Sequence, residues 1–110
     1  MHDLQQIIEN AWNDRSLLQD GTTLNAINEV ITLLDLGKLR VAQPTESGWQ
    51  VNDWVKKAVI LYFPTQKMET IEVGPFEFHD KIPLKKNYAD LGVRVVPHAI
   101  ARKGAFLEKG

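Results

Sequence analysis

The feature that most constrains the fold is a change in the spacing of apolar residues around Pro64. Before it, three stretches have apolar residues every three or four positions, which is the spacing of one helix face. After it, apolar and polar residues alternate, as is typical of strands. Because proline cannot continue a helix and disfavours helix in the residue before it, the last helix should end near Phe63.

Each of the three predicted helices has residues at its ends that favour a helix start or stop. The first begins near Asp3, whose charge suits a helix start. The second takes Thr23 as its N-cap and ends at Gly37. The third follows Asn52 as N-cap and spans residues 53–63. This third helix is apolar nearly all round except for two lysines, so we expect it to be central and mostly buried.

Two hairpins are predicted beside the helices. In the first, Leu39 and Val41 lie before residues 44–48, Trp49 and Val51 lie after them, and the turn is expected at Glu46-Ser47-Gly48.

A second hairpin, or a pair of short strands, is expected at residues 68–73 and 76–79, which a Gly-Pro pair separates. A helical turn over residues 85–91 and a strand over residues 93–96 follow. The predicted fold class is α+β, with one small domain over residues 1–96 that combines helices and β-hairpins.

Composition restricts the function classes. The 110 residues carry a formal charge of -1, which argues against a nucleic-acid or anionic-membrane surface. The chain has no cysteine, which excludes disulfides, thiolate nucleophiles and cysteine zinc sites. Its three histidines lack metal-ligand spacing, so no metal is expected. The start has no signal-peptide pattern and no apolar run can span a bilayer, so we expect a cytoplasmic protein.

No catalytic signature is present: the chain lacks GxGxxG, P-loop, HExxH and GxSxG patterns. Lys56 and Lys57 would suit a phosphate or coenzyme, but lysines on a helix more often cover it with their stems and extend into water. The three tryptophans would suit a ligand platform, yet in so small a chain they are more often core residues. These are Trp12, Trp49 and Trp54.

Arg94 is the candidate binding residue. It lies in the apolar strand predicted over residues 93–96, where a buried guanidinium needs a partner. That partner is either an internal carboxylate or the carboxylate of a ligand, held through two parallel hydrogen bonds. From physical reasoning alone, the internal ion pair is favoured.

The C-terminal segment, residues 97–110, has small or apolar residues at steps of about six. Ile100, Phe106 and the pair Gly104-Ala105 occupy these steps. This spacing resembles the first rung of a hexapeptide β-helix, an architecture that buries its core only when several rungs stack. We therefore expect residues 97–110 to begin a β-helix whose remainder is absent from this chain.

Several segments together resemble the N-terminal domain of bacterial tetrahydrodipicolinate N-succinyltransferases. In chain order they are LQQIIENAW, INEVITLLDLGKLRVA, WVKKAVILYF, DKIPLK, GVRVVP and ARKGAFL. They cover nearly all of the chain, and residues 65–76 and 86–91 match poorly. The resemblance implies a following left-handed parallel β-helix and a homotrimer.

The implied reaction transfers a succinyl group from succinyl-CoA to a cyclic dicarboxylate, tetrahydrodipicolinate, in lysine and diaminopimelate biosynthesis. In this family the coenzyme groove and the acidic catalytic residue lie in the β-helix. The resemblance therefore implies that this chain has no catalytic or coenzyme-binding residue and no bound cofactor. It also implies that the chain alone is inactive. It assigns one substrate-binding residue, the arginine of GVRVVP, which is Arg94. The alternative is a free-standing, non-catalytic interaction or assembly module with the same fold.

Overall fold

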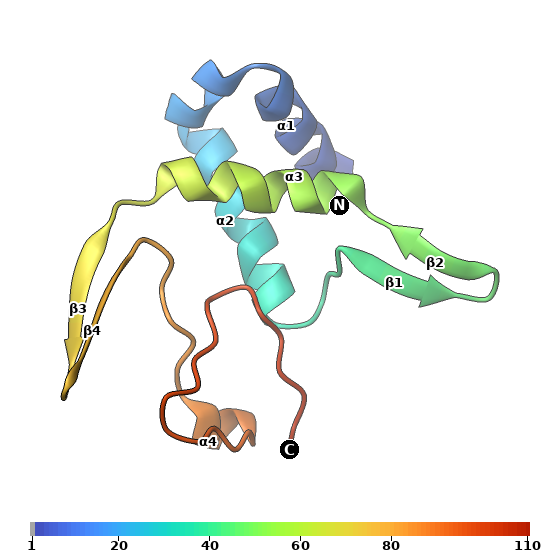
Figure 1. Cartoon of the computed structure of the whole chain (residues 1–110). Helices are drawn as coiled ribbons and strands as arrows, with labels where there is room; N and C mark the ends of the chain where they lie inside the picture. Colours follow the sequence, from blue (N-terminus) through green and yellow to red (C-terminus); the bar gives the residue numbers. More distant parts are fainter. Residues whose placement is uncertain (1) are drawn as a thin grey trace.

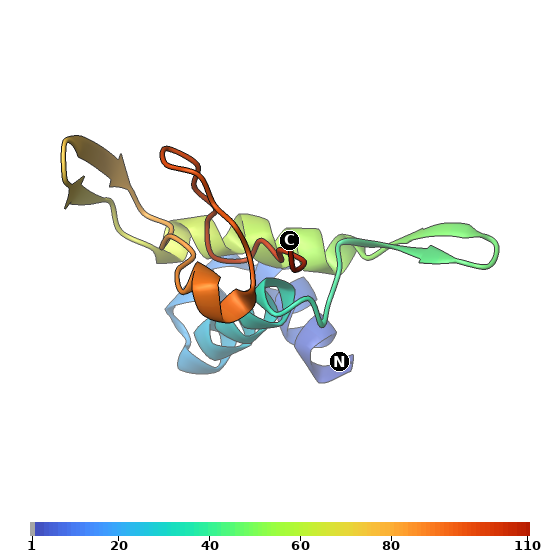
Figure 2. The same cartoon turned by 90° about the horizontal axis from the view of Figure 1, so that it is seen from below.

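The computed structural model describes residues 2–110 and confirms the α+β class (Figure 1). Three helices pack together, and α3 lies across the other two. Two separate two-stranded antiparallel hairpins extend from opposite ends of this helical core (Figure 2). The elements are α1 (His2–Asn13), η1 (Arg15–Gln19), α2 (Gly21–Asp35), β1 (Ala42–Thr45), β2 (Gly48–Val51), α3 (Asp53–Tyr62), η2 (Phe63–Thr65), β3 (Glu69–Val73), β4 (Phe76–Asp80) and α4 (Tyr88–Leu91).

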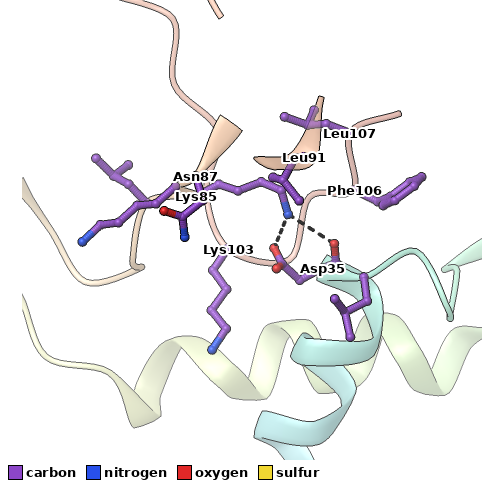
Figure 3. A pocket seen from close by; sticks show the side chains of 10 residues that line it. Asp35, Lys85, Asn87, Leu91, Lys103, Phe106 and Leu107 are labelled. Atoms are coloured by element: carbon purple, nitrogen blue, oxygen red, sulfur yellow. Dashed lines mark hydrogen bonds and ion pairs between the residues drawn. The ribbon is translucent and has the colours of Figure 1, made fainter. Parts of the chain in front are cut away.

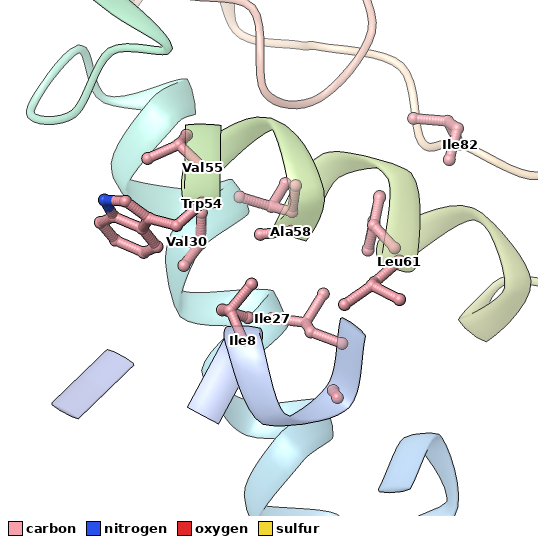
Figure 4. Close-up of a cluster of buried hydrophobic side chains, with 11 residues drawn as sticks. Ile8, Ile27, Val30, Trp54, Val55, Ala58, Leu61 and Ile82 are labelled. Atoms are coloured by element: carbon pink, nitrogen blue, oxygen red, sulfur yellow. The ribbon is translucent and has the colours of Figure 1, made fainter. Parts of the chain in front are cut away.

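The core lies where the apolar stripes of the three long helices meet (Figure 4). Ile8 of α1, Ile27 and Val30 of α2, and Val55 and Leu61 of α3 are all fully buried. This arrangement confirms the three helices predicted from the period of about 3.6 residues. No helix among residues 2–110 has the length and apolar character needed to cross a bilayer.

The start of α2 differs from the prediction. Asp20, not Thr23, is the N-cap, and its Oδ2 accepts a hydrogen bond from the Thr23 backbone N–H at 3.3 Å. Both residue types cap helices, but capping at Asp20 extends the helix and leaves Thr23 buried within its first turn. The end of α2 is as predicted: Gly37 follows it with a φ of 74°.

Helix α3 is central, as predicted, and five of its ten residues are buried. Its inner face is buried, whereas Ile60 is 41% exposed. The helix ends at Tyr62 and continues as the 3-10 turn η2 through Pro64. Asn52 holds the N-cap position without a side-chain cap bond. Its Oδ1 accepts from Gln50 Nε2 at 3.4 Å, and its Nδ2 donates to the Arg40 carbonyl at 2.8 Å.

The first hairpin forms, as predicted. Ala42 lies opposite Val51, and Pro44 lies opposite Trp49. The turn lies at residues 46 and 47, within the predicted one, whereas Leu39 and Val41 are outside β1 and Pro44 lies in the strand. A proline is tolerated there because both strands are edges of a two-stranded sheet.

The second hairpin has the predicted turn at Gly74-Pro75, with Ile71 opposite Phe78. The helical turn predicted over 85–91 is shorter, since α4 covers only Tyr88–Leu91. The strand predicted over 93–96 is wrong: these residues are not in a strand of the described chain.

The C-terminal segment folds back on the chain. The Lys85 backbone N–H donates to the Ala101 carbonyl at 2.8 Å, and that of Lys103 donates to the Pro83 carbonyl at 2.8 Å. These bonds flank an isolated antiparallel bridge between Leu84 and Arg102. Residues 81–110 therefore form one irregular layer that contacts the helical core at the end of α2 (Figure 1).

Candidate functional site

Arg94 is exposed, which removes the premise that a buried guanidinium needs an internal partner. Ion pairs among residues 2–110 join Lys57 to Glu9, Lys85 to Asp35 and Arg102 to Asp80, and none of them includes Arg94. The internal ion pair favoured from the sequence is thus not found in the described part of the chain. The guanidinium is accessible to a ligand.

The backbone around Arg94 is held by the last residue of the chain. The Arg94 N–H donates to the Gly110 carbonyl at 2.7 Å, and the Gly110 N–H donates to the Gly92 carbonyl at 3.0 Å. Gly110 thus bonds to the residues on both sides of Val93. This is the hydrogen-bond pattern of two parallel strands. Arg94 therefore lies beside the only parallel pairing among the backbone hydrogen bonds described for residues 2–110.

A second polar cluster lies at the end of α2 and was not anticipated from the sequence. Lys85 Nζ donates to Asp35 Oδ1 at 2.7 Å and to the Asp35 backbone carbonyl at 3.2 Å (Figure 3). The Gly104 N–H donates to the same Oδ1 at 2.9 Å. Asp35 thus binds two segments that are distant in sequence, and Lys85 satisfies a carbonyl that the helix end leaves free.

The environment of Asp35 keeps its carboxylate ionised. Burial alone raises the pKa of Asp35, but the hydrogen bonds from Lys85 and Gly104 and the positive charges of Lys85 and Lys103 outweigh it, so the pKa is lowered. The Lys85 side chain is only 5% exposed. The sequence did contain a signal for this pair. An acidic residue in the last turn of a helix, such as Asp35, interacts unfavourably with the helix dipole and is stabilised by a nearby cation.

A cavity of about 360 Å³ adjoins this cluster. Lys86, Asn87, Lys103 and Phe106 are among the residues that line it. Arg94 does not line it. Because Asp35 and Lys85 satisfy each other, the cluster is suited to holding the C-terminal layer in place, not to proton transfer.

Lys57 pairs within the chain instead of extending its charge into water. Lys57 Nζ bonds to Glu9 Oε2 at 2.9 Å and lies 5.7 Å from the Trp12 ring centroid, whereas Lys56 is exposed.

The tryptophans divide: Trp54 is a core residue, Trp12 is half-buried, and Trp49 is 72% exposed. The core prediction is therefore wrong for Trp49.

The histidines do not gather. His79 Nδ1 lies 3.0 Å from Thr70 Oγ1 across the second hairpin, and the His98 ring packs edge-on against Phe76 at 4.5 Å. Residues 2–110 contain no group of three potential metal ligands.

Comparison with known proteins bears on this arrangement. The model of the family described as "Tetrahydrodipicolinate N-succinyltransferase N-terminal" matches residues 3–65, which is more than half of the chain. The chain belongs to this family. The matched part of this tetrahydrodipicolinate N-succinyltransferase N-terminal domain contains the three long helices and the first hairpin.

Full-length relatives extend the similarity beyond residue 65. A 2,3,4,5-tetrahydropyridine-2,6-dicarboxylate N-succinyltransferase from Bordetella petrii is 47% identical over 97% of this chain and 43% of its own length. The enzyme of that name from Coxiella burnetii (strain Dugway 5J108-111) is 44% identical over 97% of the chain and 42% of its own length. The Legionella pneumophila (strain Paris) enzyme is 43% identical over 99% of the chain and 43% of its length.

The chain therefore spans less than half the length of these relatives. The alignments run over 115 to 119 positions, more than the 110 residues of the chain, so the relatives carry insertions relative to it. Because the similarity covers nearly the whole chain, it includes the C-terminal layer as well as the helical core.

Proposed function

We propose that this chain is the N-terminal domain of a succinyltransferase that transfers a succinyl group from succinyl-CoA to tetrahydrodipicolinate, in the cytoplasm, as a step of lysine and diaminopimelate biosynthesis. The observation that carries the proposal is the similarity, at 43–47% identity, to N-succinyltransferases over at least 97% of the chain. The product is an N-succinyl-2-amino-6-oxopimelate. The working enzyme is a homotrimer.

In this proposal the chemistry takes place outside the domain. The chain supplies neither a catalytic acid nor a coenzyme site, and both come from the part of the relatives that this chain does not match. The described residues agree with such a role: their ion pairs are arranged to hold segments together. The 110-residue chain assayed by itself should have no acyltransferase activity.

We assign residues 97–110 to the start of a β-helix. Two observations support the assignment: the six-residue steps in the sequence, and the parallel bond pattern that places Gly110 beside Val93. In a parallel β-helix, each turn of the chain lays a new strand in parallel register on the one before it. The path from Val93 to Gly110 has the form of one such turn.

Arg94 is the proposed substrate contact. Its exposed guanidinium has no ion-pair partner within residues 2–110, and its backbone is fixed by Gly110. A fixed backbone and an unpaired guanidinium, which can donate two parallel hydrogen bonds, suit the binding of one carboxylate of the cyclic acceptor. Its role is to bind and orient the acceptor, not to make or break bonds.

The test is a chimera in which this chain replaces the matched segment of the Bordetella petrii relative. We expect succinyl transfer to tetrahydrodipicolinate by the chimera and none by the 110-residue chain. Arg94→Lys in the chimera should raise the acceptor KM at least about tenfold and leave the KM for succinyl-CoA unchanged, because lysine cannot form the two-pronged contact.

Arg102→Lys is the matched control, since Arg102 is an exposed arginine of the same layer that pairs with Asp80. It should leave both KM values unchanged. A chimera that folds but transfers no succinyl group would contradict the functional proposal. An active chimera whose acceptor KM is unaffected by Arg94→Lys would contradict the assignment of Arg94 alone.

A further inference from the structure

Lys109 is brought close to Arg94 by the backbone pairing at the end of the chain. The Gly110 N–H donates to the Gly92 carbonyl at 3.0 Å, and the Gly110 carbonyl accepts the Arg94 N–H at 2.7 Å. Gly110 therefore lies opposite Val93, and Lys109, the residue before it, lies opposite Gly92. Arg94 and Lys109 are thus on adjacent parallel segments, one residue to either side of the Val93–Gly110 pair.

The two side chains lie on the same, outward face of this pairing. Val93 and Val95 are half-buried, whereas Arg94 between them is exposed, so Arg94 points away from the core. Paired residues place their side chains on the same side of a sheet, and successive residues place theirs on opposite sides. Gly110 thus shares the side of Val93, and Lys109 shares the side of Arg94. The exposure of Lys109 agrees with this placement.

The aliphatic stem of Lys109 packs on Gly92. A Cβ added at Gly92 would lie 3.3 Å from Lys109 Cγ, which is tighter than ordinary van der Waals contact. Glycine at this position therefore leaves the space that the stem occupies. The stem lies over the segment that carries Arg94 and is restricted by that packing. A side chain restricted in this way loses less conformational entropy when it binds a ligand.

Neither cation has a counter-charge in the described part of the chain. None of the ion pairs among residues 2–110 includes Arg94 or Lys109. Glu108, the acidic neighbour of Lys109, falls on the opposite side by the same alternation. Like charges on adjacent strands repel each other. An anion bound between Arg94 and Lys109 would relieve this repulsion and would accept hydrogen bonds from both.

The acceptor of the proposed reaction has the matching charge. Tetrahydrodipicolinate carries two carboxylates, on the two carbons beside its ring nitrogen. The Arg94 guanidinium can hold one of them through two parallel hydrogen bonds, and the other needs a second cation. Lysine suits that role, because its ammonium is a compact charge on a flexible stem. Two contacts fix the orientation of the acceptor, whereas one contact would allow it to rotate.

We propose that Lys109 binds the second carboxylate of the acceptor while Arg94 binds the first. The inference rests on the proposed function, because that function supplies the ligand. It adds a residue to the site and a basis for specificity: the pair selects dicarboxylates over monocarboxylates of the same length.

The first test uses the chimera with the Bordetella petrii relative. Lys109→Gln removes the charge and keeps most of the stem, so it should raise the acceptor KM at least about tenfold, the loss expected for one charge-assisted hydrogen bond. The KM for succinyl-CoA should not change, and Lys109→Arg, which keeps the charge, should retain most of the affinity for the acceptor. Lys103→Gln is the matched control. Lys103 is an exposed lysine of the same layer that lines the cavity beside Asp35, and its substitution should leave both KM values unchanged.

The second test compares two inhibitors that compete with the acceptor. Heptanedioate has the seven carbons and two terminal carboxylates of the acceptor, and heptanoate lacks one of these carboxylates. In the chimera, heptanedioate should inhibit more strongly. Lys109→Gln should raise the inhibition constant of heptanedioate at least about tenfold and leave that of heptanoate unchanged. A merely structural role of Lys109 would instead weaken both inhibitors.

The outcomes separate this inference from the function on which it rests. A folded chimera that transfers no succinyl group contradicts the proposed function, and the assignment of Lys109 falls with it. An active chimera whose acceptor KM is unaffected by Lys109→Gln overturns the assignment of Lys109 alone. Equal weakening of heptanedioate and heptanoate by Lys109→Gln overturns it as well, and so does an equal rise in acceptor KM from Lys103→Gln.

Discussion

Asp35 Oδ1 lies 2.7 Å from Lys85 Nζ, and the two residues are fifty positions apart in the sequence. This contact joins the end of α2 to the layer that carries Arg94. The same oxygen also accepts the Gly104 N–H at 2.9 Å, so one carboxylate fixes two segments. The position of Arg94, the candidate substrate contact, therefore depends on the Asp35–Lys85 pair, although neither residue contacts Arg94.

Breaking this pair should destabilise the domain more than breaking an exposed one. Asp35→Ala leaves the Lys85 ammonium, with a 5% exposed side chain, without its counter-charge and removes the acceptor for Gly104. We expect a loss of about 2–4 kcal/mol in the free energy of unfolding, measured by urea denaturation. The control, Asp80→Ala, breaks the exposed pair with Arg102 and should cause a clearly smaller loss. Equal losses would contradict a structural role for Asp35.

The stability of the domain should fall in acid in a way that depends on Asp35. Its pKa is lowered in the folded chain from the ordinary 3.8, despite burial that acts to raise it, because Lys85 and Gly104 bind the ionised form. The stabilisation is complete above the pKa of the unfolded chain and is lost as pH falls through the lower pKa of the folded chain. Urea titrations from pH 6 to pH 2 should therefore show a smaller decline for Asp35→Asn than for the parent chain. Asp80 has a lowered pKa too, chiefly because the Lys81 N–H binds it, so part of the decline should remain.

Gly37→Ala should be destabilising for two reasons that can be separated. The φ of Gly37 is 74°, and an added Cβ would lie 2.7 Å from the Phe106 ring. Gly74→Ala is the matched control, because its φ of 57° is also left-handed but nothing lies within 4 Å. Thermal unfolding should show a loss of about 1 kcal/mol for Gly74→Ala, the backbone cost alone, and a larger loss for Gly37→Ala.

The double variant Gly37→Ala with Phe106→Ala identifies the second cause. Its free energy of unfolding is compared with that of Phe106→Ala alone. With the ring removed, Gly37→Ala should cost no more than Gly74→Ala. An undiminished loss would show that contact with Phe106 is not part of the cost.

Two neighbouring residues of α3 should respond very differently to truncation. Leu61 is fully buried, so Leu61→Ala should cost about 2–5 kcal/mol through lost burial and the cavity left behind. Ile60, the residue before it, is 41% exposed, and Ile60→Ala should cost about 1 kcal/mol or less. Urea denaturation measures both. Similar values would mean that the helix is rotated relative to the described packing.

Arg94→Ala should leave the free energy of unfolding within about 0.5 kcal/mol of the parent value. Its side chain is exposed and forms none of the ion pairs found in residues 2–110, and its bond to Gly110 uses only the backbone. Chemical denaturation of the 110-residue chain is the measurement. A large loss would indicate a structural role and would weaken its assignment as a ligand contact.

The sequence predicted the elements whose signal is local. The helical period identified α1, α2 and α3, Gly37 marked the end of α2, and Gly74-Pro75 marked the second turn. The N-cap predicted for α2, Thr23, was wrong, because the structure uses Asp20, three residues earlier. The motif segments of the sequence also indicated the family to which the chain belongs.

What depended on distant partners came only from the tertiary structure. A strand exists only where another strand supplies hydrogen bonds, so the apolar pattern of residues 93–96 could not establish one, and the Arg94 N–H bonds to Gly110 instead. The pairing of Asp35 with Lys85 and the exposure of Trp49 likewise depend on how the chain folds back on itself. Local periodicity determines which residues share a face, because it follows from backbone geometry. Which segment packs on that face depends on contacts between parts of the chain that are far apart in sequence.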